Sequence, residues 1–114
     1  MHEYSIISAL VDQVEAQAAA HPGATVRIVH VAIGEQAGVE VELLATAFET
    51  FRGGTVCADA ELRIEARPAR WVCPTCKAEL PRGAKPRCVP CAAPATLASG
   101  DEIMLQRIEL EMED

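Results

Sequence analysis

The sequence predicts a small α/β (α+β) protein, in which a three-stranded sheet and two helices are interrupted by an inserted zinc-ribbon module with four cysteine ligands. Two observations lead to this prediction. Segments with helical and strand periodicity alternate along the first half of the chain, and a turn-rich segment with four regularly spaced cysteines precedes one last alternating strand. The chain has 114 residues, half of them apolar, which is the length of one ordinary domain with enough apolar residues for a core.

Two segments carry apolar residues at helical spacing. The first predicted helix covers residues 5–20, where Ile6, Leu10 and Val14 recur at four-residue intervals and a proline–glycine pair follows. The second predicted helix covers residues 40–52, and a pair of glycines follows it. The apolar residues that share one face of the second helix are Leu44, Ala47, Phe48 and Phe51.

Three segments predict strands. Residues 25–33 are rich in β-branched side chains, as expected for a largely buried strand. Residues 60–66 and 102–112 alternate between apolar and charged side chains, so each is expected to bury one face and expose the other. The strand at 102–112 follows the cysteine-rich segment, so the sheet is completed only after that segment has been inserted.

The chain is therefore expected to form two domains. Residues 1–67 and 100–114 together make the α/β domain, and residues 68–99 make the ribbon domain. The segment between the cysteine pairs contains two prolines and a glycine, which makes it too rich in turns for a long helix.

Four of the five cysteines form two Cys-x-x-Cys pairs, Cys73 with Cys76 and Cys88 with Cys91, separated by eleven residues. Two such pairs can place four thiolates around one ion in the tetrahedron that zinc prefers. Zinc held by four sulfurs has no open position for a substrate, so the site is expected to be structural. Two disulfides, a dithiol redox site and a rubredoxin-like iron centre remain alternatives from the spacing alone.

The chain start has neither a basic region nor a long apolar run, and no segment has the length that a bilayer demands. We therefore expect a cytoplasmic protein that does not bind membranes, in a compartment where thiols stay reduced. Cys57, the fifth cysteine, has no evident partner and is expected to be a small buried hydrophobic residue.

The net charge of −7 is unevenly distributed along the chain. Six of the ten basic residues surround the cysteine pairs, while the rest of the chain is strongly acidic. An acidic body repels phosphates, and Trp71 is the only aromatic residue near the ribbon that could stack on a base, so a nucleic-acid-binding ribbon is the weaker alternative. The six basic residues are Arg67, Arg70, Lys77, Arg82, Lys85 and Arg87.

The opening Met1-His2-Glu3 is a second candidate metal site. The α-amine, the first backbone amides and the imidazole of His2 offer several nitrogens within one short chelate. Four nitrogens in a plane suit Ni(II) or Cu(II), whereas zinc prefers a tetrahedron. The alternative is an ordinary surface histidine. His21, at a predicted helix end, and His30, inside a predicted strand, are expected to have structural roles.

The chain resembles the HypA/HybF family, the nickel-incorporation metallochaperones of hydrogenase maturation. The resemblance covers nearly the whole chain and rests on Met1-His2-Glu3 at the start together with both cysteine pairs. Where the family usually has Gly-Glu-Leu-Ser-Gly-Val after the first strand, this chain has Gly-Glu-Gln-Ala-Gly-Val at residues 34–39, a change that affects neither metal site. The other matching segments are residues 31–35 (VAIGE), 44–49 (LATAFE), 54–55 (GT), 60–65 (AELRIE) and 100–103 (GDEI).

The resemblance implies a carrier of nickel and not an enzyme, and no Ser–His–Asp arrangement, phosphate loop or open three-ligand zinc motif occurs in the sequence. It implies docking to a maturation GTPase of the HypB type and transfer of Ni(II) to the large subunit of a nickel–iron hydrogenase, with urease as a further client of some relatives. A monomer and a homodimer are both compatible with it. The implied ligands are His2, Met1 and Glu3 for nickel, and Cys73, Cys76, Cys88 and Cys91 for zinc.

Overall fold

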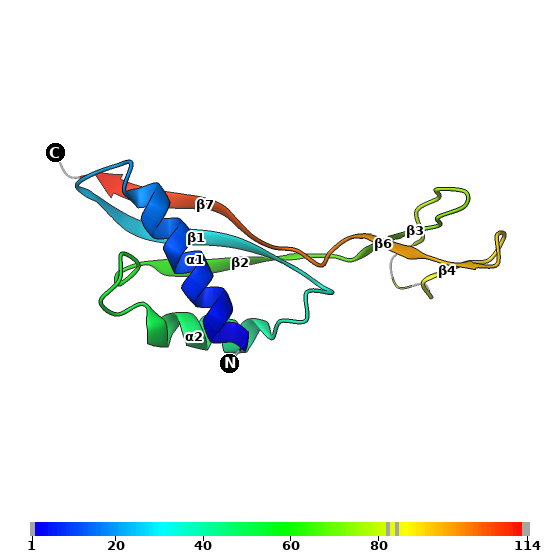
Figure 1. The fold of residues 1–114 in the computed structure, drawn as a ribbon, viewed down its shortest axis with the longest axis horizontal. Coiled ribbons are helices and arrows are strands. Elements are labelled where there is room, and N and C mark those ends of the chain that lie inside the picture. The colour runs from blue at the N-terminus through cyan, green and yellow to red at the C-terminus, as the bar shows by residue number, and fades with distance from the viewer. Residues whose placement is uncertain (1, 82, 84, 113–114) are drawn as a thin grey trace. The chain divides into compact units, whose positions relative to one another are not determined.

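The computed structural model describes residues 2–81, 83 and 85–112 (Figure 1). For His2 it describes the backbone but not the side chain. Its helices are α1 (His2–Ala18) and α2 (Val41–Phe51), and the predicted fold class of two helices, a small three-stranded sheet and an inserted four-cysteine module is confirmed. The strands in the described part of the chain are β1 (Ala24–Gly34), β2 (Glu61–Arg67), β3 (Arg70–Val72), β4 (Arg87–Cys88), β5 (Ala93–Pro94), β6 (Thr96–Ser99) and β7 (Ile103–Met112).

The largest sheet has the order β2-β1-β7, which places the apolar strand β1 at its centre. Residues 31–34 of β1 are all buried, as expected for a central strand. β7 runs opposite to β1, because Arg27 pairs with Glu111 while the later residue His30 pairs with the earlier residue Glu109. The predicted strands at 25–33, 60–66 and 102–112 thus all belong to this sheet, with ends shifted by at most one residue.

The core lies where α1 crosses the sheet and packs against α2 (Figure 1). The buried residues of both helices recur at three- and four-residue spacing, so each helix turns one apolar stripe inward. Phe51, which we expected on the buried face of α2, is half-buried at the end of that helix. The buried helical residues are Ile7, Leu10, Val11 and Val14 of α1, and Leu44, Ala47 and Phe48 of α2.

Helix α1 begins at His2, three residues earlier than predicted. Tyr4 lies one helical turn before the fully buried Ile7 and is half-buried itself, so the apolar stripe extends back towards the chain start. Glu3 adds a negative charge to the first turn, where the helix dipole favours it. As a result, the candidate nickel-binding residues lie at the start of a helix.

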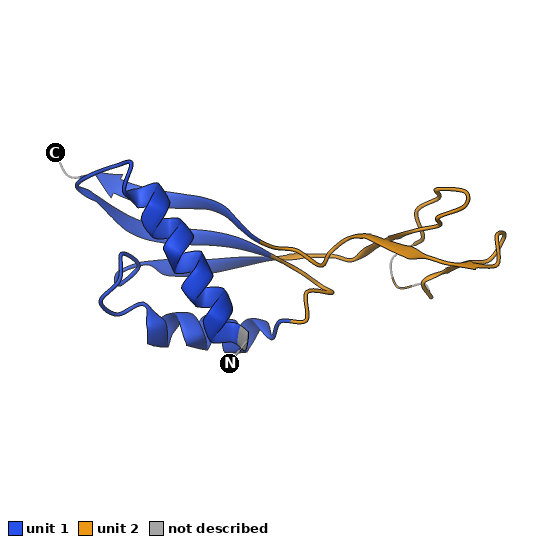
Figure 2. Cartoon of the chain, viewed as in Figure 1, with its two compact units in different colours: residues 1–32, 39–65, 104–114 blue, residues 33–38, 66–103 orange. Residues whose placement is uncertain are grey.

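Contacts between Cα atoms divide the chain into two compact units (Figure 2). The first unit comprises Met1–Ala32, Val39–Glu65 and Met104–Asp114. The second comprises Ile33–Gly38 and Ala66–Ile103, and it contains all four paired cysteines. Among the described residues, no helix is both long and apolar enough to cross a membrane.

In the second unit, β3 pairs with β6 and β4 pairs with β5, both antiparallel. These strands are two to four residues long. The sequence analysis missed them because alternation cannot be recognised over so few residues.

Backbone hydrogen bonds join three distant segments of the second unit. The N–H of Gln36 donates to the carbonyl of Gly100 (2.6 Å), and the N–H of Glu35 donates to the carbonyl of Arg67 (2.8 Å). The side chain of Glu35 accepts a further bond from the N–H of Ala69 (2.8 Å). The turn that departs from the usual family sequence is therefore held by main-chain bonds that do not depend on the side chain of Gln36.

Candidate metal centre

The first cysteine pair lies at the tip of a hairpin that begins with β3. The N–H of Cys73 donates to the carbonyl of Ala78, and the N–H of Leu80 donates to the carbonyl of Trp71, both at 2.9 Å. These bonds close the chain around Cys76. The turn-rich sequence predicted a short turn here, and the hydrogen bonds show what holds it.

The second pair lies at the tip of another hairpin, formed by β4 and β5. Cys88 is opposite Ala93 in the antiparallel register, which leaves Cys91 in the connecting turn. The guanidinium of Arg87 donates to the carbonyl of Ala92 (3.1 Å) and so fastens the turn. The two cysteine pairs therefore have similar settings: the first cysteine ends a strand or directly follows one, and the second lies in the turn.

Each turn contains one residue in the left-handed region immediately after its second cysteine. Lys77 has φ 65° and Ala92 has φ 49°. Residues other than glycine rarely adopt this conformation, because Cβ crowds the following carbonyl. The same reversal at both positions turns the chain back after each Cys-x-x-Cys pair.

The two hairpins bring all four sulfurs together. The Sγ atoms of Cys73, Cys76, Cys88 and Cys91 lie within 4.8 Å of one another, and the Cys76 and Cys88 sulfurs, from different hairpins, are 3.9 Å apart. Zinc–sulfur bonds of about 2.3 Å in a tetrahedron require sulfur–sulfur distances of about 3.8 Å. The number, type and spacing of these ligands therefore fit a tetrahedral zinc ion.

Hydrogen bonds prepare one of these sulfurs to bind a cation. The N–H groups of Cys76 and Thr75 donate to the Sγ of Cys73 at 3.5 and 3.4 Å, and with these bonds the pKa of Cys73 falls to about 6. Hydrogen bonding with the sulfurs of Cys76, Cys73 and Cys88 raises the pKa of Cys91 to about 12. Four thiols this close resist joint ionisation, and a divalent cation between them offsets that repulsion.

All five cysteines lie in the described residues and are free thiols, so the predicted alternative of two disulfides is not observed. Cys57 is fully buried in the first unit, away from the sulfur cluster. Burial, followed by the charge of Glu15, raises the pKa of Cys57 to about 11. The prediction that Cys57 is a small buried hydrophobic residue is confirmed.

The other candidate site lies at the start of α1. Met1 and the side chain of His2 lie outside the described residues, while the backbone of His2 begins the helix. Glu3 is half-buried and, with Tyr4 and Leu43, lines an open hollow of about 210 Å³ between the two helices. The first N–H groups of a helix have no helical acceptor, so the amides at this end are available to other partners.

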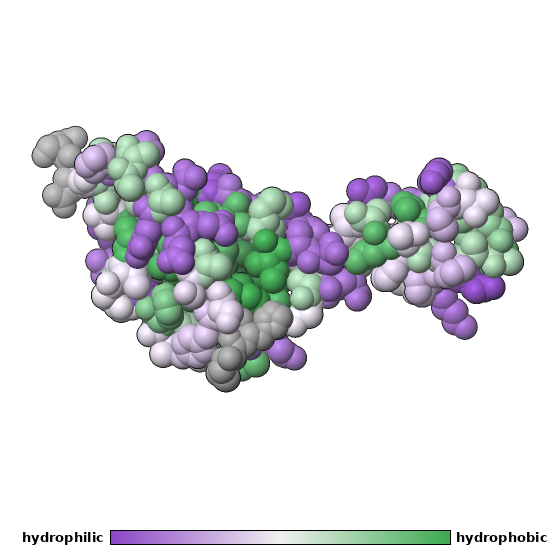
Figure 3. All heavy atoms as spheres, in the orientation of Figure 1, coloured by the Kyte–Doolittle hydropathy of each residue, from purple (hydrophilic) through white to green (hydrophobic). Residues whose placement is uncertain are grey.

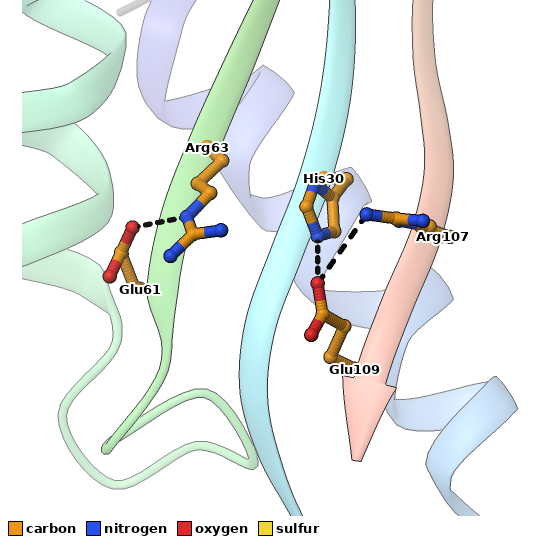
Figure 4. Close-up of polar contacts among 5 residues, drawn as sticks. All are labelled: His30, Glu61, Arg63, Arg107 and Glu109. Atoms are coloured by element: carbon orange, nitrogen blue, oxygen red, sulfur yellow. Dashed lines mark hydrogen bonds and ion pairs between the residues drawn. The ribbon is translucent and has the colours of Figure 1, made fainter.

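The other two histidines lie in different settings. The side chain of His30 is 14% exposed, and its Nε2 lies 2.5 Å from Oε2 of Glu109 on the neighbouring strand β7 (Figure 4). The expected hydrogen-bonded role of His30 is thus confirmed. His21 is exposed just after α1. The alternation of β7 indicated that Glu109 faces outward, but the sequence did not reveal which residue it contacts.

Taken together, the fold and the sulfur cluster define a small α/β metal-binding protein with an inserted ribbon of the zinc type. A family model described as hydrogenase/urease nickel incorporation, metallochaperone, hypA, matches residues 1–110. The chain belongs to the HypA family, whose members are nickel metallochaperones in hydrogenase maturation.

Curated relatives have the same extent as this chain. The hydrogenase maturation factor HypA of Wolinella succinogenes is 45% identical over 117 residues, covering 100% of this chain and 98% of that protein. The factor of the same name from Shewanella sp. (strain MR-7) is 39% identical over 118 residues, with coverage of 100% and 98%. The sequence similarity to these relatives therefore extends over both compact units.

Solved structures agree with this assignment. The solution structure of the nickel metallochaperone HypA from Helicobacter pylori matches with a TM-score of 0.74 at 30% identity, covering 97% of this chain and 98% of that chain. A second solution structure, described only as that of HypA protein, matches with a TM-score of 0.78 at 32% identity, covering 99% of this chain and 98% of that chain.

Proposed function

We propose that this protein binds Ni(II) at its chain start and delivers it to the large subunit of a nickel–iron hydrogenase, while zinc bound by the four cysteines stabilises the ribbon. The observation that carries the proposal is the match of a nickel-incorporation family to residues 1–110, which include both candidate metal sites. In domain terms, residues 1–67 with 100–114 form the nickel-binding part and residues 68–99 the zinc-binding part.

The proposed nickel ligands are the α-amine of Met1, the amides of His2 and Glu3, and the imidazole of His2, with the carboxylate of Glu3 contributing. The start of α1 at His2 supports this arrangement, because these amides have no helical acceptor. A planar set of nitrogens selects Ni(II) over zinc. The partial positive charge of a helix start opposes a bound cation, which suits cargo that must be released.

The proposed zinc site is structural. Four sulfurs leave no position for a substrate, and the small strands around the site have little core of their own. An iron centre in the same position would serve electron transfer, which has no part in the nickel incorporation for which the family is described. The protein therefore acts as a carrier and not as an enzyme.

The proposed partners are a GTPase of the HypB type, which receives or helps to release the nickel, and the hydrogenase large subunit. The family description also names urease, so the urease pathway is a second candidate client. Neither nucleic acid nor membrane is proposed as a partner, because the acidic majority of the chain repels phosphates. Free thiols suit the reducing cytoplasm, where we place the protein, as a monomer or homodimer.

The nickel site is tested by comparing His2→Ala with a Gly-Ser extension ahead of Met1. The extension keeps every side chain but converts the amine to an amide. We expect both changes to abolish specific Ni(II) binding in calorimetry, with zinc content and far-UV circular dichroism unchanged. His21→Ala, a change of an exposed histidine just after α1, is the matched control and should bind nickel like the original protein.

Undiminished nickel binding by the extended protein would show that the amine is not a ligand. Delivery is tested separately, in cells that lack their own copy of this protein. The original sequence should restore nickel in the hydrogenase large subunit and the His2→Ala variant should not. Equal restoration by the original protein and the variant would contradict a carrier role for this site.

A further inference from the structure

The ribbon contains more basic side chains than its own acidic residue can neutralise. In residues 68–99 the only acidic residue is Glu79, and its carboxylate is already paired with Arg70 at 2.6 Å. Zinc held by four thiolates adds two negative charges, which still leaves the ribbon positive. The five basic residues of this segment are Arg70, Lys77, Arg82, Lys85 and Arg87.

Three of these cations lie close to the sulfur cluster along the chain. Lys77 directly follows the second cysteine of the first pair, and Arg87 directly precedes the first cysteine of the second pair. The sulfurs of these two cysteines, Cys76 and Cys88, lie 3.9 Å apart. A tight turn brings Lys85 close to Arg87, because the N–H of Arg87 donates to the carbonyl of Lys85 (2.7 Å). The backbone thus gathers three exposed basic residues around one cluster.

Carboxylates that complement these cations are not supplied by the ribbon. Among the described residues, Lys77, Lys85 and Arg87 form no ion pair. The guanidinium of Arg87 donates to the carbonyl of Ala92 (3.1 Å), which leaves most of its five N–H groups for other acceptors. Complementary carboxylates would therefore have to come from another molecule.

Exposed apolar residues lie beside these charges. Val89 directly follows Cys88 and is 86% exposed, the largest exposed fraction among the large hydrophobic residues of the described chain. Pro90, the next residue, is exposed as well. Hydrophilic and hydrophobic residues are both exposed on the visible face of the second unit (Figure 3). This surface therefore combines positive charge with an apolar contact area.

We propose that this surface docks an acidic segment of another protein that also carries apolar side chains. The carboxylates of the segment pair with the three cations, and an apolar side chain packs against the exposed valine and proline. This inference goes beyond nickel delivery, although it requires a ribbon folded around its four sulfurs. We call the surface the basic tip, and its residues are Lys77, Lys85, Arg87, Val89 and Pro90.

A protein segment fits the basic tip better than a nucleic acid does. A nucleic acid offers phosphates but no aliphatic side chain to pack against Val89, and the basic tip contains no aromatic residue on which a base could stack. The first unit is also strongly acidic and repels a long polyanion. A short acidic segment can pair with the cations without approaching that unit.

The test measures fluorescence polarisation of short labelled peptides with the zinc-loaded protein. One peptide alternates aspartate with leucine, and a second peptide of the same length alternates aspartate with serine. We expect the aspartate–leucine peptide to bind more tightly, with an affinity that falls as salt is raised. Lys85→Glu should weaken this binding by about tenfold or more, because it replaces an attraction with a repulsion. Val89→Ser should weaken binding of the aspartate–leucine peptide only.

Two exposed residues of the first unit provide matched controls. Arg107→Glu makes the same kind of charge reversal at a side chain that is 69% exposed on β7. Met112→Ser removes an apolar side chain at a residue that is 58% exposed. Both variants should bind the peptide like the original protein. Zinc content and far-UV circular dichroism identify any variant with a damaged fold, and Lys85→Gln, which only removes the charge, replaces Lys85→Glu if that variant loses zinc.

Three results would overturn the proposal. The first is no binding of either peptide by the original protein. The second is equal affinity for the two peptides, since the apolar contact at Val89 would then contribute nothing, or equal weakening by Lys85→Glu and Arg107→Glu. The third is tighter binding of a single-stranded RNA of the same charge, with the same sensitivity to Lys85→Glu, which would assign the basic tip to nucleic acid.

Discussion

The carbonyl oxygen of Gly100 lies against Gly34, in the space that a Cβ atom at position 34 would occupy. Gly100 in turn has φ 110°, and a Cβ there would meet the backbone of Ala69. Both glycines belong to the second unit, at the point where its three chain segments exchange hydrogen bonds. Their lack of side chains allows the backbones to approach closely enough for these bonds.

The first prediction concerns this contact. Gly34→Ala should destabilise the protein by about 1–3 kcal/mol, because backbone atoms must move to accommodate the methyl group. Urea unfolding followed by circular dichroism measures the loss. The control is Gly53→Ala, because a Cβ at residue 53 meets no atom within 4 Å. Equal stability of the two variants would contradict the close packing at Gly34.

The second prediction concerns the sulfur cluster. Cys91→Ala should lower the zinc content and unfold the ribbon, because three thiolates hold zinc less well and the hairpins have little other support. Elemental analysis and near-UV circular dichroism report the two effects. Cys57→Ala removes a fully buried thiol outside the cluster and should keep a full equivalent of zinc. Loss of zinc from that control would show that the ligand set is different.

The third prediction concerns the left-handed residues of the two turns. Ala92→Gly should raise stability by up to about 1 kcal/mol, because relief of strain at φ 49° exceeds the added entropy of the unfolded chain. Ala92→Val should have the opposite effect, since a β-branched side chain tolerates this conformation poorly. Thermal unfolding of the zinc-loaded protein distinguishes the two. The same order of stabilities is expected at Lys77.

The fourth prediction concerns pH. The hydrogen bond from His30, together with the charges of His30, Arg107 and Arg63, lowers the pKa of Glu109 below its ordinary value of 4.5. The folded protein therefore holds the carboxylate form more strongly than the unfolded chain does. The contribution of Glu109 to stability should be present above pH 4.5 and disappear as the pH falls through the lower, folded-state pKa.

This pH dependence is measured by urea unfolding of the original protein and of Glu109→Gln across the acidic range. The two free energies of unfolding should differ most above pH 4.5 and converge at lower pH. A constant difference at every pH would mean that the carboxylate charge does not contribute through His30.

The sequence by itself determined the elements of the α/β unit and the membership of the sulfur cluster. Apolar spacing in residues 5–20 and 40–52 predicted both helices, since a helix that covers a sheet must bury one stripe. Two Cys-x-x-Cys pairs predicted one metal site, and the structure places all four sulfurs together. The helices depend on apolar residues that are close in the sequence. The sulfur cluster depends on paired cysteines, a ligand type that has few other uses.

Only the tertiary structure decided the contacts between residues distant in the sequence. The pairing of His30 with Glu109 depends on the register between β1 and β7, which no local pattern specifies. The contact of Gly34 with Gly100 depends on three segments converging, and the early start of α1 depends on the packing of Tyr4 next to the core. Each is set by long-range packing, which acts on the folded chain and leaves little trace in local spacing.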